Sequence, residues 1–222
     1  MNYSGILFDL DGTLVNTLDD VADAMNRVLE SRGFPLHSVQ SYRDRIGWGS
    51  RVLVEKALPA EHGDNGFEDE NLVEACLAEF LADYAAHPVV KARLYPGIPE
   101  LLDELEHKGV PKLILSNKTE PIVHQVVDAC LDGWTFLKAW GNVDWRPRKP
   151  DPQGVIDICS QVDLDPKDIL YIGDSEIDME TAVRAGCLPV GVLWGFRDRE
   201  ELVASGAKIL AEHPSDILNI FQ

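Results

Sequence analysis

The chain alternates between short apolar runs and longer amphipathic segments. Apolar runs at 5–8, 112–115, 168–172 and 189–193 are each followed by turn-forming or polar residues, which predicts four buried strands. The segments 98–108 and 176–185 repeat their apolar residues with the period of a helix and are closed by Gly109 and Gly186. Strands that alternate with helices predict an α/β fold: a doubly wound parallel sheet, a Rossmann-like core, with helices on both faces.

The segment from about 17 to 88 breaks this rhythm. It has helical periodicity at 19–32, 50–58 and 70–86 and contains no convincing strand. We therefore predict an α/β core made of residues 1–15 and 91–222, and a small helical domain of residues 16–90 inserted after the first strand. The hinges are expected near Asn16-Thr17 and Pro96-Gly97.

Charge narrows the range of partners. The 222 residues carry a formal net charge of -18, which disfavours nucleic acid and anionic membranes because both need a basic face. An anionic substrate must then be met by local positive charge, by a metal ion, or by both. The oligomeric state is left open between monomer and homodimer.

The cysteines and the N-terminal sequence bear on the compartment. The four cysteines are widely spaced and lie in apolar stretches, so we expect reduced core thiols at Cys76, Cys130, Cys159 and Cys187. The chain starts without a basic segment and apolar run of the signal type, and no stretch approaches the roughly 18 apolar residues of a membrane span. We expect a cytoplasmic protein.

Polar residues interrupt the apolar pattern where the predicted strands end. In open parallel sheets, ligands bind in the crevice outside the carboxyl ends of the strands. We therefore expect one crevice to collect these side chains, together with a lysine from the loop before the helix that starts near 153. The candidates are Asp9, Asp11, Gly12, Thr13, Ser116, Asn117, Lys149, Asp174 and Asp178.

The chemistry of this set points to phosphate and a metal ion. Carboxylates gathered in one crevice repel each other unless a cation binds them, and Mg²⁺ prefers oxygen ligands and shares its shell with phosphate. Phosphoryl transfer depends largely on positioning and on opposite charge, which Lys149, Ser116 and Asn117 can supply. A carboxylate can be the nucleophile while a second one moves protons, and Asp9 and Asp11 suit these two roles.

Each of these residues also has an ordinary explanation. An Asp-Gly pair usually forms a turn, Ser116-Asn117 and Asp174-Ser175 can cap helices, and Lys149 can be a solvated loop charge. The site is favoured because several such exceptions of complementary chemistry occur in order at strand ends.

With these motifs in place, the sequence resembles the haloacid dehalogenase-like hydrolase superfamily over nearly its full length. The motifs that carry the resemblance are Asp-Leu-Asp-Gly-Thr at 9–13, Ser116, Lys149, and Gly-Asp-Ser-Glu-Ile-Asp at 173–178. The resemblance implies that Asp9 is the nucleophile and a Mg²⁺ ligand, and that Asp11 is the acid and base and binds the metal through its backbone carbonyl.

The resemblance also implies roles for the remaining motif residues. Asp174 would be a further metal ligand, and Asp178 would assist through metal-bound water or by orienting its neighbours. The phosphate would be held by Ser116, Asn117 and Lys149, with Gly12 and Thr13 supporting the first loop. The dehalogenase branch lacks the acid at the position of Asp11, so its presence favours phosphate chemistry.

Residues around these motifs are similar to phosphoglycolate phosphatases. They include the runs 13–18, 116–118, 149–152, 46–50 and 194–196. The expected function is therefore a Mg²⁺-dependent phosphatase that hydrolyses a small phosphorylated metabolite, phosphoglycolate above others, through an aspartyl-phosphate. A related sugar-phosphate phosphatase is the alternative.

By the same resemblance the helical segment is a cap that closes over the phosphate site. Gly47-Trp48-Gly49-Ser50-Arg51 is the stretch expected to face the substrate, with Arg51 pairing with a second anionic group such as a carboxylate. The alternative is that Trp48 belongs to the core and Arg51 is solvated.

Three rival functions remain open. A β-phosphoglucomutase-like phosphomutase would use the same aspartyl-phosphate but needs extra basic contacts in the cap, whereas 61–79 is acidic. A non-catalytic interaction protein conflicts with the intact acids and lysine. A receiver-type signalling domain has its acids and lysine in another order and no helical cap.

Overall fold

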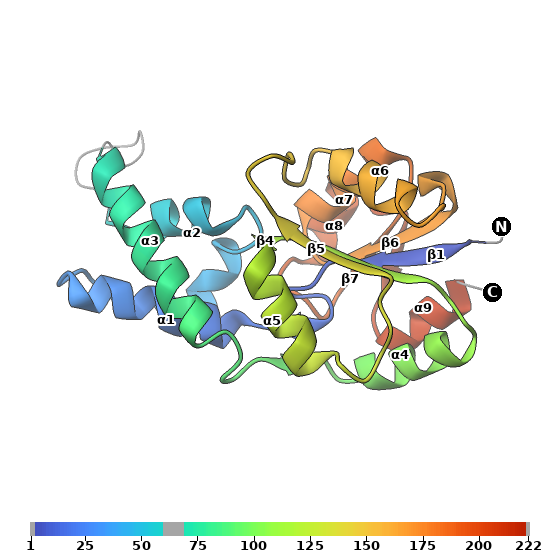
Figure 1. The fold of residues 1–222 in the computed structure, drawn as a ribbon, viewed down its shortest axis with the longest axis horizontal. Helices are drawn as coiled ribbons and strands as arrows, with labels where there is room; N and C mark the ends of the chain where they lie inside the picture. The colour runs from blue at the N-terminus through green and yellow to red at the C-terminus, as the bar shows by residue number, and fades with distance from the viewer. Residues whose placement is uncertain (1–2, 60–68, 221–222) are drawn as a thin grey trace.

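The computed structural model describes residues 3–59 and 69–220, so 60–68 of the acidic stretch lie outside the described residues. Helices gather at one end of the molecule and a sheet flanked by helices forms the rest (Figure 1). The helices are α1 (Leu18–Ser31), α2 (Ser50–Ala57), α3 (Glu70–Ala86), α4 (Ile98–His107), α5 (Glu120–Cys130), α6 (Gln153–Ser160), α7 (Glu176–Ala185), α8 (Arg199–Ala204) and α9 (Pro214–Ile220).

The large sheet is parallel throughout, in the order β5-β4-β1-β6-β7-β8. Its strands are β1 (Gly5–Phe8), β4 (Lys112–Thr119), β5 (Lys138–Asn142), β6 (Ile169–Gly173), β7 (Leu188–Val192) and β8 (Ile209–Ala211). The chain adds strands on one side of β1 through β4 and β5, and on the other side through β6, β7 and β8. The strand order therefore reverses beside β1, where ligands bind in such sheets.

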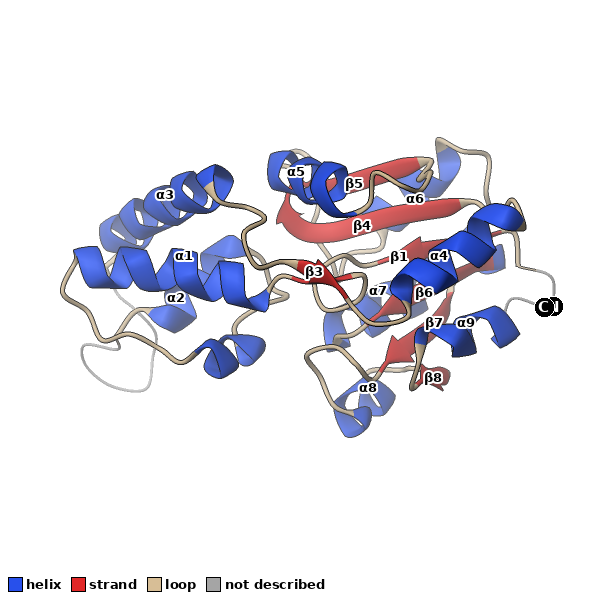
Figure 2. Cartoon of the chain, turned by 90° about the horizontal axis from the view of Figure 1, so that it is seen from below, coloured by secondary structure: helices blue, strands red, loops and turns tan. Residues whose placement is uncertain are grey.

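Both faces of the sheet are covered, as its apolar strands require. Ile6 and Phe8 point to one face and join a cluster with side chains of α4, α5 and α9, whereas Leu7 points to the other and packs with α6 and α7. Figure 1 shows α4 and α9 below the sheet and α6 and α7 above it, so α4 and α9 lie in front of the sheet in the view from below (Figure 2). Alternate residues of β1 thus belong to different clusters, and the whole strand is buried.

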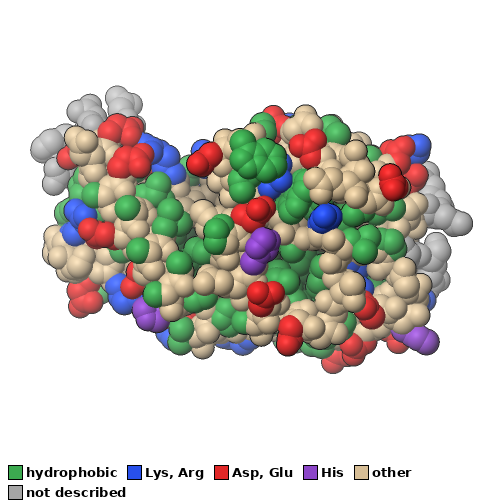
Figure 3. Space-filling model, in the orientation of Figure 1, with side chains coloured by type: hydrophobic (Ala, Val, Ile, Leu, Met, Phe, Trp, Pro, Cys, Tyr) green, Lys and Arg blue, Asp and Glu red, His purple; other side chains and the backbone are tan. Residues whose placement is uncertain are grey.

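The helical part is built from α1, α2, α3 and the 3₁₀ helix η1 (Val39–Asp44). A second 3₁₀ turn, η2 (Pro166–Asp168), precedes β6. α1 places Ala22, Met25 and Leu29 on its inner face, and these residues share one apolar cluster with the sheet part. A two-stranded antiparallel ladder, β2 (Val15–Asn16) with β3 (Arg93–Leu94), joins the two parts. A notch on the surface marks the junction (Figure 3).

The predicted doubly wound parallel sheet is confirmed, with corrections at its edges. β4 extends to Thr119, so Ser116 and Asn117 lie inside the strand and not after it; its pairing with β5 shifts between Leu115 and Thr119. β5 and β8 lie at the two edges and were not predicted, because β5 is interrupted by polar residues and glycine and the apolar run of β8 is only three residues long. The helices at 50–57, 70–86 and 176–185 follow the sequence pattern closely.

Two further expectations concern membrane-spanning helices and the cysteines. No helix among the described residues is long and apolar enough to cross a bilayer. Three of the four cysteines are buried and Cys130 is half-buried, and all four are free thiols.

The return connection from the helical part is fixed by one buried acid. Asp20, 3% exposed in the first turn of α1, accepts hydrogen bonds from the backbone N–H groups of Val90, Lys91 and Ala92 at 2.8–3.0 Å. These three donors lie just before β3, where the chain re-enters the sheet part. Asp20 therefore sets where the second connection between the parts begins.

We predict that Asp20→Ala lowers the free energy of unfolding by about 2 kcal/mol, because three backbone N–H groups lose their hydrogen bonds to a charged acceptor. Asp19→Ala is the matched control, since Asp19 lies in the same turn and its side chain accepts no hydrogen bond from the described residues. Urea unfolding followed by circular dichroism measures both. Equal losses in the two variants would contradict the role given to Asp20.

Candidate active site

The first functional loop follows β1 directly. Asp9 is the residue after Phe8, and its backbone N–H donates to the carbonyl of Ile172 on β6. Gly12 has φ +87°, and a Cβ there would lie 2.2 Å from Asp174 Oδ2. The loop therefore needs glycine at 12, both for its positive φ and to leave room for Asp174 at the end of β6.

Asp174 follows β6 and is held by two donors. Thr13 Oγ donates to its Oδ1 at 3.2 Å, and the backbone N–H of Phe196 donates to its Oδ2 at 2.7 Å. A Cβ at Gly195 would collide with the Asp174 side chain at 2.2 Å, so a second glycine makes room for this carboxylate. Thr13 thus orients Asp174, and its predicted part in holding the phosphate stays a prediction.

Asp178 is fully buried, takes part in the cap of α7 and forms an ion pair with Lys149. Ser175 caps α7 and donates to Asp178 Oδ2 from both its backbone N–H and its hydroxyl, which completes a capping box. Asp178 Oδ1 accepts from Lys149 Nζ at 2.7 Å and from the Tyr171 hydroxyl at 3.3 Å. Asp178 therefore takes part in the cap of α7 and also pairs with Lys149, and its part in a metal site stays a prediction.

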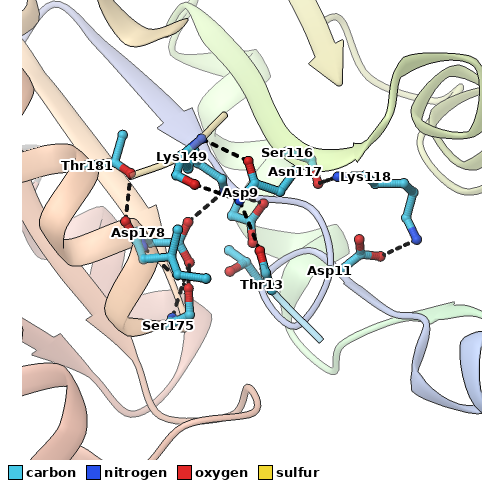
Figure 4. Close-up of polar contacts among 12 residues, drawn as sticks. Asp9, Asp11, Thr13, Ser116, Asn117, Lys118, Lys149, Ser175, Asp178 and Thr181 are labelled. Carbon is cyan, nitrogen blue, oxygen red and sulfur yellow. Dashed lines mark hydrogen bonds and ion pairs between the residues drawn. The ribbon is translucent and has the colours of Figure 1, made fainter. Parts of the chain in front are cut away.

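Lys149 connects the acids. It is 4% exposed, and its Nζ also donates to Asp9 Oδ1 at 2.8 Å (Figure 4). Asn117 fixes its backbone: the amide oxygen accepts from Lys149 N–H, and the amide nitrogen donates to the carbonyls of Lys149 and Gly47. Ser116 lies beside it, with its hydroxyl accepting from the N–H of Lys118. The loop lysine predicted from sequence therefore reaches the crevice.

Burial and mutual repulsion shape the charge of this cluster. Burial, followed by the charge of Asp178, raises the pKa of Asp9 to about 7, although Lys149 opposes the shift. Burial and the charges of Asp178 and Asp9 raise the pKa of Asp174 well above its usual range. One lysine does not neutralise three adjacent carboxylates.

This donor set fits a hard divalent cation. Oxygens of Asp9, Asp174 and Asp178 lie within 4.8 Å of one another, and all three residues are buried. Lys149 Nζ donates a hydrogen bond to Asp9 Oδ1, whereas Asp9 Oδ2 accepts no hydrogen bond from the described residues. An all-oxygen site with excess negative charge is what Mg²⁺ and similar ions bind.

Asp11 points away from this cluster. Its Oδ1 accepts from the Thr17 hydroxyl at 2.5 Å and pairs with Lys118 Nζ at 3.0 Å. Lys118 is 9% exposed, and it also donates to the hydroxyl of Tyr84 on α3 at 2.7 Å. The second acid of the first motif is thus held at the junction between the sheet part and the helical part.

A cavity of about 50 Å³ lies between the two parts and is lined by Asp9, Asp11 and Asp174. Its sheet side presents the acids, Ser116, Asn117 and two lysines. Its helical side is mainly apolar and is formed by Val21, Ile46, Gly47, Gly49, Ser50, Leu53, Phe80 and Tyr84.

Arg51 does not line the cavity. Its guanidinium pairs with Glu55, Glu70 and Glu74 on the outside of the helical part. Arg51 is therefore corrected from a substrate-facing residue to part of a surface ion-pair network, because acids of α2 and α3 surround it. Its neighbour Trp48 contacts the sheet part, with Nε1 donating to Glu176 at 2.9 Å.

Two arginines at the junction were missed from the sequence. Arg43 donates to the carbonyls of Gly195 and Phe196, and Arg197 donates to the carbonyls of Arg43 and Ile46. Their acceptors are backbone groups far away in sequence, so no residue pattern marks them. Lys118, by contrast, directly follows the Ser-Asn pair, and its position at a strand end was a usable signal.

Comparisons with known proteins agree with this geometry. Residues 6–192 match the model of the haloacid dehalogenase-like hydrolase family. Phosphoglycolate phosphatase 1 of Pseudomonas aeruginosa is 31% identical over 96% of this chain and 78% of its own length. N-acetylmuramic acid 6-phosphate phosphatase of the same organism is 31% identical over 99% of this chain and 95% of its own.

A solved structure extends the likeness to the whole fold. The crystal structure of a predicted phosphoglycolate phosphatase from Haemophilus somnus superposes with a TM-score of 0.88 at 29% identity. The match covers 100% of this chain and 99% of that one. Both the sheet part and the helical part are therefore common to the two proteins.

The raised pKa of Asp9 predicts a pH dependence of stability in the absence of divalent cations. A carboxyl whose pKa rises on folding, here from 3.8 to about 7, stabilises the fold fully below pH 3.8, and this contribution is lost as pH rises through about 7. In chelator, the free energy of unfolding should therefore fall between pH 5 and pH 8. Asp9→Asn should flatten this fall, as urea titrations can show; parallel curves for both proteins would refute the assignment.

Proposed function

We propose, for a chain that belongs to the haloacid dehalogenase-like hydrolase family, the hydrolysis of phosphoglycolate through a phosphorylated Asp9. That the protein is a phosphatase follows from its family and its relatives. The observation that carries the proposal is the place of Asp9: it lies at the switch point of the sheet, 2.8 Å from Lys149 Nζ, with one carboxylate oxygen unpaired among the described residues. The named relatives support phosphoglycolate as the substrate.

The proposed reaction has two displacements at phosphorus. In the first, a carboxylate oxygen of Asp9 bonds to phosphorus, the bond from phosphorus to the ester oxygen breaks, and Asp11 gives that oxygen its proton. In the second, water attacks the phosphorus of the acyl-phosphate, Asp11 takes a proton from it, and Asp9 is released as a carboxylate. The products are glycolate and inorganic phosphate, and both acids return to their starting state.

The phosphoryl group is held by residues that the structure groups around Asp9. Lys149 uses two donors on Asp9 and Asp178 and keeps a third for a phosphate oxygen. The Ser116 hydroxyl lines the same cavity. Asn117 holds the Lys149 backbone and thereby positions the lysine.

Mg²⁺ is the proposed cofactor, supported by the buried acidic cluster. The residues that would hold it are Asp9, Asp174 and the backbone carbonyl of Asp11, with Asp178 contributing charge from its bond to Lys149. When bound, the ion neutralises charge on the phosphoryl oxygens.

The helical part, residues 16–90, is proposed to act as the cap. Its contacts with the sheet part include polar ones, such as Asn117 to the Gly47 carbonyl and Arg43 to the Gly195 carbonyl. Polar contacts of this kind can be exchanged with water when the parts separate to admit substrate. Free thiols at all four cysteines support a reducing compartment such as the cytoplasm.

We predict that Asp9→Asn lowers kcat by at least about 10³-fold and abolishes phosphorylation of the enzyme, because an amide is a poor nucleophile. Phosphate release from phosphoglycolate and mass spectrometry of acid-quenched protein measure the two effects. Asp128→Asn on the exposed side of α5 is the control. A phosphorylated peptide that persists without Asp9 would place the nucleophile elsewhere.

We predict that EDTA stops turnover, that added Mg²⁺ restores it, and that Mg²⁺ raises the melting temperature more at pH 8 than at pH 5. The pH difference arises because more of the Asp9 carboxyl is ionised above its pKa of about 7. In Asp174→Asn the effect of Mg²⁺ on the melting temperature should shrink. Full activity in EDTA would exclude a metal requirement.

Product analysis separates hydrolysis from transfer. Equal amounts of glycolate and phosphate are expected from phosphoglycolate, whereas conversion of β-glucose 1-phosphate into glucose 6-phosphate would indicate a mutase. N-acetylmuramic acid 6-phosphate is the comparison substrate that a relative suggests.

A further inference from the structure

We propose that Lys118 and Tyr84 together bind the carboxylate of the substrate, directly beside the ester bond that is broken. Lys118 comes from β4 in the sheet part, and Tyr84 comes from α3 in the helical part. Both line the cavity that contains Asp9. This inference rests on the proposed function and names the residues that select its substrate.

Lys118 and Tyr84 each keep a donor for a ligand. The Lys118 ammonium has three N–H donors, and the described residues use two of them: Asp11 Oδ1 at 3.0 Å and the Tyr84 hydroxyl at 2.7 Å. The Tyr84 hydroxyl accepts from Lys118, and its own hydrogen goes to no described residue. Two donors therefore converge at one point of the cavity wall.

The distance from the reacting atoms suits phosphoglycolate. Its carboxyl carbon is separated from the ester oxygen by a single methylene group. Asp11 is the proposed proton donor to that oxygen, and Lys118 lies 3.0 Å from Asp11 (Figure 4). When Asp11 protonates the ester oxygen, the carboxylate lies only one methylene group from that oxygen. The carboxylate must therefore lie near Lys118, the ion-pair partner of Asp11.

The other cations of the cavity are already engaged. Lys149 pairs with Asp9 and Asp178, at the phosphoryl end. Arg197 pairs with Glu176 and donates to two carbonyls of the helical part. Lys118 is thus the cation among the cavity-lining residues that faces the leaving group.

The surroundings of Lys118 strengthen a charge pair. Leu53, Phe80 and Ile122 line the same cavity, and the centroid of the Tyr84 ring lies 4.5 Å from Nζ. In such low-polarity surroundings a carboxylate gains far more from the ammonium than a neutral hydroxyl does. A substrate without the carboxylate leaves the two donors unpaired, which is how buried polar sites reject analogues.

The test compares phosphoglycolate with 2-hydroxyethyl phosphate, which has a neutral hydroxymethyl group in place of the carboxylate. The measured quantity is the ratio of kcat/KM for the two esters in the presence of Mg²⁺. Lys118→Met should lower this ratio by at least about 30-fold, because it removes one partner of a buried charge pair. Tyr84→Phe, which keeps the ring, should lower it by about 10-fold.

Lys56→Met is the matched control. It makes the same chemical change in α2, but Lys56 is exposed, donates to the Asp44 carbonyl, and does not line the cavity. Its ratio should stay within about twofold of the wild type. Tyr84→Phe also keeps the test decisive if Lys118→Met fails to fold.

The outcomes distinguish this proposal from the proposed function. A wild-type preference for phosphoglycolate that survives in both Lys118→Met and Tyr84→Phe overturns the carboxylate site but leaves the function intact. A wild type that prefers another carboxylate-bearing ester, such as 3-phosphoglycerate, and loses that preference in both variants refutes phosphoglycolate but supports the site. A wild type without any preference for carboxylates overturns both.

Discussion

The buried group of carboxylates at the switch point of the sheet is the constraint on which the rest of the structure depends. Asp9, Asp174 and Asp178 have oxygens within 4.8 Å of one another, and only Lys149 pairs with them among the described residues. Such a cluster is costly unless its charge is matched. The sheet topology brings the acids together, glycines make room for Asp174, and Asn117 holds the lysine in place.

The junction between the two parts is coupled to this cluster. Arg43 donates to the carbonyls of Gly195 and Phe196. The backbone N–H of Phe196, in the same loop, donates to Asp174. A movement of the helical part therefore bears on the loop that orients a proposed metal ligand. Lys118 makes a second such connection, because it pairs with Asp11 on one side and with Tyr84 of α3 on the other.

The sequence was a good guide where a residue acts through its neighbours in the chain. The strand at 5–8, the helix at 176–185 and the grouping of Asp9, Lys149 and Asp174 could all be predicted, because apolar periodicity and strand ends are local signals. Arg51 shows the limit of this reasoning. Its glycine-rich context suited an anion site, yet acids of α2 and α3, set by helix packing, hold its side chain on the outside.

The sequence by itself determined which reactive side chains are available, the acids and the lysine, and the alternating pattern that carries them to one edge of a sheet. Only the tertiary structure decided which way the side chains face. In the folded chain Asp11 pairs with Lys118, and Asp178 accepts hydrogen bonds from Lys149 and Ser175. Arg43 and Arg197 donate to backbone carbonyls across the junction. The physical reason is that the pattern of a strand or helix follows from adjacent residues, whereas an ion pair or a carbonyl contact depends on groups that meet only when distant segments pack.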